Sequence, residues 1–201
     1  MSTCEAAHAV NEGTSSQLKM QLTDETGRPI TKATIDAVAL TLWDIATEDI
    51  INSRDAQDIK DANGGTLQGE LTISAITQAY PAVMTFTASH NLRDGDAVYI
   101  ENITGMTELN GRQFDVYPIS DTKVALKNED STTHTAWSAG GTARTSLLMV
   151  DLTASDNALV TTSISRREFE EHQALIAVTY STTKTLNVDV RIDVRQLRKV
   201  T

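Results

Sequence analysis

Three aspartates in one short segment have the residue type and spacing that come closest to a metal site. The segment RDAQDIKDANGG contains Asp55, Asp58 and Asp61. Calcium requires several carboxylate and carbonyl oxygens, often from a single loop. An EF-hand, however, places its ligands at every second position and ends with a bidentate glutamate, which this segment lacks. The sequence therefore favours a solvated acidic loop without a metal, and these aspartates are the first candidates if the chain binds a cation.

Catalytic groupings are also sparse. The Asp94-Gly95-Asp96 run offers two carboxylates, as glycoside hydrolysis requires, but Asp-Gly is a turn signal and a turn between two strands is favoured. No Gly-x-Ser-x-Gly sequence marks a nucleophile. The histidines form no pair at helical spacing: His8, His90, His134 and His172. We therefore expect no enzymatic activity, no zinc site and no cofactor.

Composition and charge exclude several classes of binding partner. The 201 residues include 27 acidic and 17 basic side chains, for a net charge of −10, so we expect no nucleic-acid binding. Cys4 is the single cysteine, which excludes an intrachain disulfide and suits a reducing cytoplasm. The chain begins without a secretory signal pattern and has no run of 18 apolar residues. A soluble protein without a membrane partner is expected.

Alternation of apolar and polar residues with period two dominates the sequence. Residues 186–195 alternate from Leu186 to Arg195, which predicts a strand with one wet face. The same pattern predicts strands over 18–22, 36–44 and 172–180. No window has the period of an amphipathic helix, so the predicted fold class is all-β. Two short helical turns are predicted between strands, over the ranges 153–159 and 165–172.

The middle of the chain differs from its ends. Residues 73–145 contain shorter strand candidates and denser turn signals, which predict a small β-barrel. Gly-Gly pairs lie near both ends of this segment, so the barrel is interpreted as an insertion between two parts of one domain, 15–72 and 146–201. Residues 1–14 have little apolar content and are predicted to be a separate arm that orders by adding to a neighbour's edge strand.

The segment GMTELNGR has the residues of either a ligand loop or a tight turn. Asn110-Gly111 between alternating segments favours a two-residue hairpin turn, since both residues tolerate positive φ. Glu108 and Arg112 then flank the turn and face solvent. We take Asn110, Arg112 and Trp137 as candidate interaction residues, because Trp137 lies in a polar loop where an exposed aromatic ring can contact a partner.

The middle segment resembles a recurrent module of tailed-phage structural proteins. This module is the small β-barrel named after the first catalytic cysteine half-domain of ubiquitin-activating enzymes. The landmarks that carry the resemblance are Pro-Ala-Val at 81–83, His-x-Leu-x-x-Gly-Asp at 90–96, the GMTELNGR turn at 105–112, and Gly-Gly-Thr at 140–142. The segment contains no cysteine, so the resemblance implies the barrel fold and not thioester chemistry.

The flanking segments are similar to an immunoglobulin-like domain of phage virion proteins. The similarity rests on four segments: DETGRPI at 24–30, residues 38–67 with Gly-Gly near their end, DLTASDNALV with its Asp-Asn pair at 151–160, and EEHQALIAVTY at 170–180. Where such domains tend to have glycine after Ile-Asn, this chain has Ser53. The resemblance implies a discontinuous immunoglobulin-like β-sandwich that carries the inserted barrel.

The two resemblances together imply a function. They indicate a non-enzymatic structural protein of a tailed-phage virion, at the head surface or the head-to-tail neck, as a decoration, collar or adaptor protein. The expected partners are other virion proteins (capsid, portal or neck, and tail) and further copies of the chain, which assemble in the host cytoplasm. The alternative is an adhesion module at the tail tip or baseplate that contacts host glycan or protein.

Overall fold

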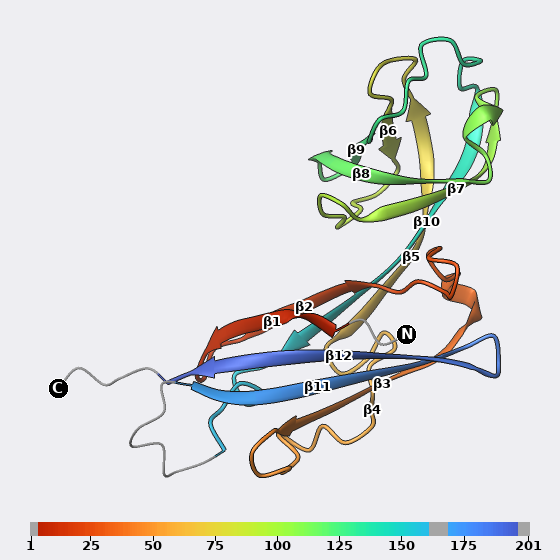
Figure 1. Cartoon of the computed structure of the whole chain (residues 1–201). Helices are drawn as coiled ribbons and strands as arrows, with labels where there is room; N and C mark the ends of the chain where they lie inside the picture. Colours follow the sequence, from red (N-terminus) through yellow and green to blue (C-terminus); the bar gives the residue numbers. More distant parts are fainter. Residues whose placement is uncertain (1–3, 161–168, 197–201) are drawn as a thin grey trace. The chain divides into compact units, whose positions relative to one another are not determined.

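The chain is an all-β protein, as its sequence predicts. The computed structural model describes residues 4–160 and 169–196 (Figure 1). In these ranges every regular element is a strand, apart from two short 3-10 turns, η1 (Lys32–Thr34) and η2 (Thr107–Leu109). No helix in the described ranges is long and apolar enough to cross a membrane.

The strands divide between two compact units. The sheet unit contains residues 1–20, 34–67 and 148–201, and the barrel unit contains residues 21–33 and 68–147. The sequence placed the barrel at 73–145 and residues 21–33 with the other domain. In the structure the divisions after Leu67 and after Leu147 fall inside long strands, β5 (Gly65–Ile76) and β10 (Ala139–Leu152), because these strands supply residues to both units.

Residues 21–33 belong to the barrel unit through side-chain contacts that the sequence pattern does not reveal. The Gln21 amide accepts a hydrogen bond from Ala97 N at 2.9 Å and donates to Ala97 O and Thr145 O. The Arg28 guanidinium lies over the Tyr99 ring, 5.1 Å from its centre. These contacts tie a segment far away in sequence to the barrel strands.

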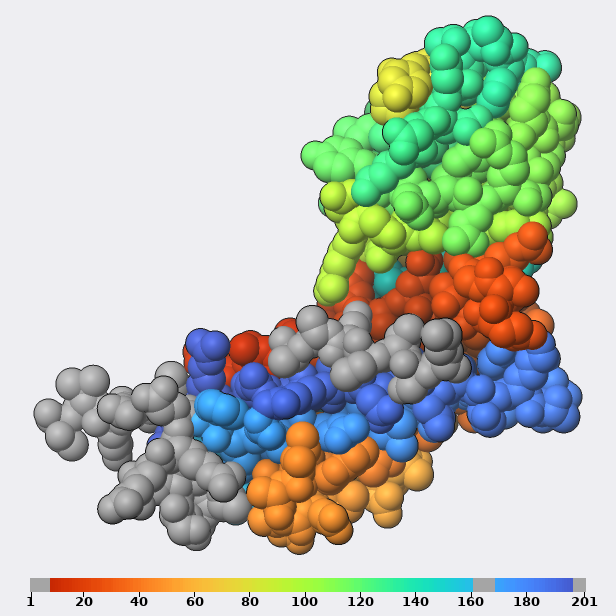
Figure 2. All heavy atoms as spheres, viewed as in Figure 1, coloured from red at the N-terminus to blue at the C-terminus, as the bar shows by residue number. Residues whose placement is uncertain are grey.

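The sheet unit is built on a five-stranded sheet with alternating burial. The strand order is β1-β12-β11-β3-β4, and β11 alternates inward and outward side chains along its length. Figure 2 shows β11 and β12, in blue, lying side by side. The five strands are β1 (Cys4–Asn11), β3 (Ile35–Asp44), β4 (Gln57–Asp58), β11 (Phe169–Tyr180) and β12 (Lys184–Arg195). Its core includes Val38, Leu40, Leu42, Ile176, Val178, Val190 and Ile192.

The N-terminal segment differs from the predicted free arm. Cys4–Asn11 form β1, which pairs in parallel with β12 at the edge of the chain's own sheet. Val10 lies opposite Val194 in this pairing and is buried. The sequence predicts that this segment pairs with an edge strand of a neighbouring molecule. It pairs instead with β12 of its own chain.

The barrel unit is a closed six-stranded barrel. Its strands follow the order β10-β5-β6-β9-β8-β7, and β7 closes the ring by pairing with β10, with Ile100 opposite Ala143. The remaining four strands are β6 (Val83–Phe86), β7 (Ala97–Thr104), β8 (Arg112–Ser120) and β9 (Lys123–Leu126). Strand β2 (Ser16–Gln21) also pairs with β10 outside the ring, but all of its residues except Gln21 belong to the sheet unit. Inward side chains fill the barrel, including Ile73, Met84, Phe86, Val98, Ile100, Ile103, Phe114, Val116, Val124 and Leu126.

The two predicted helical turns are not helices in the described residues. Residues 153–157 form a single turn, in which Asn157 N donates to Thr153 O at 3.3 Å. From Phe169 onward the second segment is strand β11, and residues 165–168 lie outside the described ranges. Strand pairing along β3 and β12 outweighs the helical propensity of the glutamates in this segment, as tertiary contacts often do.

A buried ion pair joins the two chain segments of the sheet unit. The Arg54 guanidinium donates from Nε and Nη2 to the two carboxylate oxygens of Asp156, at 2.9 and 2.8 Å. Asn52 and Thr153 donate further hydrogen bonds to the same carboxylate. Burial alone would raise the pKa of Asp156, but the hydrogen bonds from Arg54, Asn52 and Thr153 outweigh it and lower the pKa to about 2.

We predict that Asp156→Asn destabilises the sheet unit by roughly 3–5 kcal/mol near pH 7, because it leaves a buried guanidinium without its counter-charge. Since the carboxyl has a lower pKa when folded, the stabilisation is complete above about pH 4 and is lost as pH falls toward 2. Urea unfolding from pH 7 to pH 2 measures this. The exposed Asp55→Asn is the control, and a wild-type advantage over D156N that is independent of pH would contradict the assignment.

Gly141 lies where the barrel core leaves no room for a side chain. Its φ is +109°, and an added Cβ would lie 2.9 Å from Ile103 Cγ1 and 3.0 Å from Ile73 Cδ1. Gly95 shares a positive φ of +90° but has open space around it, so Gly95→Ala tests backbone strain alone. We expect Gly141→Ala to lower the free energy of unfolding by roughly 1–3 kcal/mol more than Gly95→Ala does. Equal losses for the two variants would show that packing at Gly141 is loose.

Candidate functional site

An exposed aromatic groove lies on the outer surface of the barrel. A cavity of about 340 Å³ is surrounded by Tyr80, Pro81, Tyr117, Ala125, Lys127 and Asn128. Tyr80 is 65% exposed and Tyr117 is 55% exposed, and Ile119 further along β8 is 51% exposed. Tyr80 and Tyr117 therefore make this groove a candidate contact surface.

The strand pattern of the barrel explains why these side chains point outward. In β8 Phe114 and Val116 face the barrel core, so Tyr117 faces outward. Tyr117 lies opposite Ala125 of β9, whose small side chain leaves room for the groove. One side of the groove, Tyr117 and Ala125, is thus built on paired strands, whereas Tyr80 and Pro81 belong to the connection between β5 and β6.

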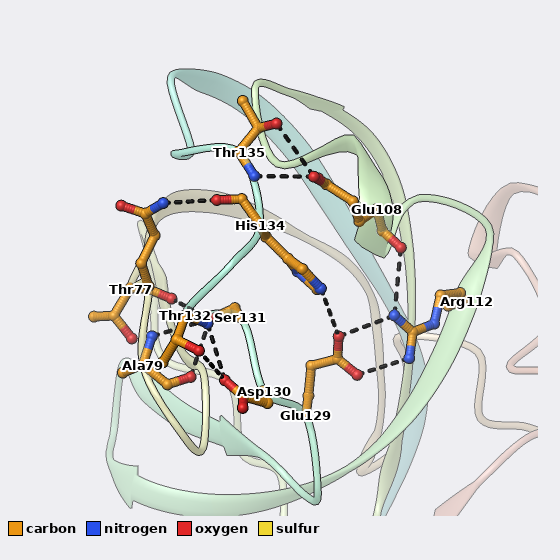
Figure 3. A network of polar contacts seen from close by, with 11 residues as sticks. Thr77, Ala79, Glu108, Arg112, Glu129, Asp130, Ser131, Thr132, His134 and Thr135 are labelled. Carbon is orange, nitrogen blue, oxygen red and sulfur yellow. Dashed lines mark hydrogen bonds and ion pairs between the residues drawn. The ribbon is translucent and has the colours of Figure 1, made fainter.

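A network of hydrogen bonds holds the edge of the groove (Figure 3). The Ser131 hydroxyl accepts a hydrogen bond from Ala79 N at 3.1 Å and donates to Thr77 O at 2.7 Å. Ser131 N also donates to Ala79 O. Ala79 precedes Tyr80, so Ser131 fixes the backbone that carries this tyrosine. Figure 2 shows the segment after β9, in teal, on the outside of the barrel unit.

The same network contains Arg112, a predicted interaction residue. Its guanidinium donates to both carboxylate oxygens of Glu129, at 2.9 and 2.7 Å (Figure 3). It also lies over the Phe114 ring. His134 Nε2 lies 3.7 Å from the same carboxylate. A bidentate pair of this kind fixes geometry as well as charge. Arg112 therefore anchors the segment that begins at Glu129, directly after the groove residue Asn128.

Two exposed acids hold the far part of this segment. Glu108 accepts hydrogen bonds from Thr135 N and Thr135 Oγ1, at 2.9 and 3.2 Å, and the bond from the backbone N–H chiefly lowers its pKa. The Thr132 hydroxyl and N–H donate to Asp130, which lowers the pKa of that carboxyl as well. The lowered pKa of each acid favours its charged carboxylate, which accepts these hydrogen bonds from the loop.

The other two predicted interaction residues also make contacts within the barrel. The Asn110 side chain exchanges two hydrogen bonds with the backbone of Ile103, at 2.8 and 2.9 Å. Trp137 is partly buried against the barrel core, and its indole N–H donates to Gly140 O at 3.0 Å. Both side chains have structural roles that the local sequence does not reveal.

The turn at Asn110-Gly111 is longer than the predicted two-residue hairpin. Residues 105–111 connect β7 to β8 and contain η2. Asn110 has a φ of −64° and a ψ of 137°, and Gly111 alone has a positive φ, of 75°. This combination is typical of a type II turn, which needs a single glycine. Glu108 and Arg112 are exposed as predicted, but both are held by the loop that follows β9.

The acidic segment and the Asp-Gly-Asp run lie in turns. Asp58 and Asp61 each accept a hydrogen bond from a nearby backbone N–H, and all three aspartates of that segment, including Asp55, are exposed. Asp94 forms a surface ion pair with Lys127. The Asp96 carboxylate accepts a hydrogen bond from the backbone N–H of Arg93. Neither pattern assembles a cluster of three metal-ligating atoms in the described ranges.

The structure does bring together one such cluster, which the sequence analysis missed. Among the described residues, Asp44, Glu170 and His172 can each offer one ligand atom within 4.8 Å of the others. All three are buried in the sheet unit. Asp44 is far in sequence from Glu170 and His172 and meets them through the pairing of β11 with β3, so no local motif predicts the cluster.

A second depression, in the sheet unit, is polar. It has a volume of about 380 Å³ and is lined by Asn52, Arg54, Gln57, Asn63, Gly64, Asp151 and Thr153. Arg54 is the one cation among these lining residues, and its guanidinium is already bound to Asp156 and to Asn63 O. Because this guanidinium already has partners, we take the aromatic groove as the better candidate for a contact site.

Comparison with known families identifies the barrel segment. Residues 80–146, about a third of the chain, match the family described as the ubiquitin-activating enzyme E1 FCCH domain. No curated protein matches the chain. The matched segment contains the groove and the loop network, and its closed barrel agrees with the predicted module. The match concerns this segment alone, which lacks a cysteine.

Proposed function

We propose that the chain is a non-enzymatic structural protein of a tailed-phage virion, at the head surface or the head-to-tail neck. In this role the barrel unit contacts a neighbouring virion protein through its aromatic groove. The observation that carries the contact is the exposure of Tyr117 on strand β8 and of Tyr80 in the connection between β5 and β6. Tyrosine is enriched at the energetic centres of interfaces because it combines apolar area with a hydroxyl group.

The resemblance of the chain to phage virion modules supports the proposed location. The barrel segment has the landmarks of that module, including Gly140-Gly141-Thr142, and belongs to a closed barrel. We further propose that the sheet unit is an immunoglobulin-like sandwich. The five-stranded sheet with alternating burial, and the buried Asp156-Asn157 pair between two strands, support this finer assignment.

A contact role also agrees with the chemistry of the groove. Its six lining residues include no carboxylate, imidazole or thiol, and Lys127 is paired with Asp94 at 2.6 Å. An ion pair this exposed contributes little energy and serves mainly to position charge. Binding at such a surface depends on shape and on burial of the tyrosine rings. The proposed partners are a second virion protein and further copies of this chain.

Adhesion at the tail tip or baseplate is the second candidate. The same two exposed tyrosine rings offer flat surfaces on which a sugar ring or an apolar host side chain can pack. In that case the groove would face the host and would not contact the particle. The two roles therefore predict different effects for the same substitutions.

The double substitution Tyr80→Ala and Tyr117→Ala tests the proposal. Particles are assembled in cells that supply either the wild-type chain or the variant, and incorporation is measured by quantitative mass spectrometry. We expect incorporation to fall at least tenfold, because two central tyrosines commonly contribute roughly 2 kcal/mol or more to binding. Ile50→Ala, which removes an exposed apolar side chain in the sheet unit, is the control and should incorporate normally.

The other possible results distinguish the structural role from the adhesion role or contradict the proposal. Normal incorporation of the double variant with loss of host adsorption would favour adhesion and contradict the neck or head contact. Normal incorporation with normal adsorption would exclude the groove as a functional surface. Failure of the wild-type chain to enter particles would contradict the virion proposal itself.

A further inference from the structure

Three buried polar residues meet at one end of the β3–β11 pair. Asp44 is the last residue of β3 and lies opposite His172 of β11. Glu170 precedes His172 by two residues, so both side chains leave the same face of the strand. The exposed fractions of Asp44 and His172 are 0%, and that of Glu170 is 5%. Two carboxylates and one imidazole are thus withdrawn from water in the same place.

The hydrogen bonds of this cluster leave two buried atoms without partners. His172 Nε2 lies 2.8 Å from Glu170 Oε1, which also accepts a hydrogen bond from Val160 N. Asp44 Oδ1 accepts from Ala46 N and Thr47 N, at 3.1 and 2.7 Å. Asp44 Oδ2 and His172 Nδ1 are buried and have no hydrogen-bond partner. Such atoms carry a large desolvation cost unless something binds them.

We propose that Asp44 and His172 bind one divalent metal ion of the zinc type in the sheet unit, and that Glu170 orients the imidazole ring of His172. The three residues offer ligand atoms within 4.8 Å of one another. Zinc binds carboxylate oxygen and imidazole nitrogen at about 2.0–2.2 Å, so two of its ligand atoms lie at most about 4.4 Å apart, and small side-chain rotations bring the ligand atoms of this cluster into that range. The ion supplies the positive charge that two buried carboxylates require.

The arrangement favours zinc over calcium or magnesium. Those two cations prefer sites made of oxygen alone, whereas imidazole suits zinc and its transition-metal neighbours. The contact between His172 Nε2 and Glu170 also matches a common feature of metal sites. There a carboxylate accepts the N–H of the ring nitrogen that does not bind the metal, and this fixes the orientation of the imidazole.

Zinc titration of the full-length, chelator-treated chain tests the proposal. Calorimetry should detect one Zn²⁺ per chain, and free Zn²⁺ at a hundred times the dissociation constant should raise Tm by about 5–10 °C. His172→Gln and Asp44→Asn should each weaken binding about a hundredfold or more, and Glu170→Gln about 10–100-fold. His134→Gln is the matched control, since His134 also lies beside a glutamate but in the barrel unit.

Several results would overturn the proposal. They are the absence of saturable Zn²⁺ binding to the wild-type chain, binding that survives both His172→Gln and Asp44→Asn, and binding lost in His134→Gln. If the cluster variants fail to fold, X-ray absorption of the wild-type complex still decides. A shell with one imidazole and otherwise oxygen ligands is expected, whereas a shell that includes sulfur or several imidazoles contradicts the site.

Discussion

The sheet unit depends on the buried contact between Arg54 and Asp156. These residues lie 102 positions apart, on opposite sides of most of the barrel sequence. Either charge alone would be costly to bury, so each segment becomes stable only when the other is in place. The ion pair adds to the pairing of β3 with β11, which also joins the two parts of this discontinuous unit. Asn52 and Thr153 extend the contact on either side.

The barrel unit is stabilised in a different way, by closure of its ring of strands. Its strands close on themselves, so the ring leaves no open edge to be covered by another part of the chain. Inward positions are occupied by a continuous apolar core, which leaves the outward positions of β8 and β9 free to carry contact residues. Tyr80 and Tyr117 lie on this outer surface, and the Ser131 and Glu129 contacts hold the backbone beside them. A rigid scaffold thus presents a small aromatic surface.

The sequence predicts the strands well because alternation is a local signal, and it predicts the barrel from short strands and dense turns. It misses features that depend on distant contacts. Cys4–Asn11 read as a polar arm but pair with β12, and residues 21–33 join the barrel through Gln21. The cluster at Asp44 and His172 follows from strand register, which no segment reveals alone. Arg112 and Trp137 appear free in sequence but are held by partners elsewhere in the barrel.

The proposed virion role is tested most directly by the copy number of this chain in purified phage particles from the source of the sequence. Quantitative mass spectrometry would compare it with the major capsid protein. A fixed number is expected, either about a dozen copies for a neck ring or hundreds for a head decoration, because virion proteins occupy symmetric positions. Absence of the chain from the particles would contradict the account.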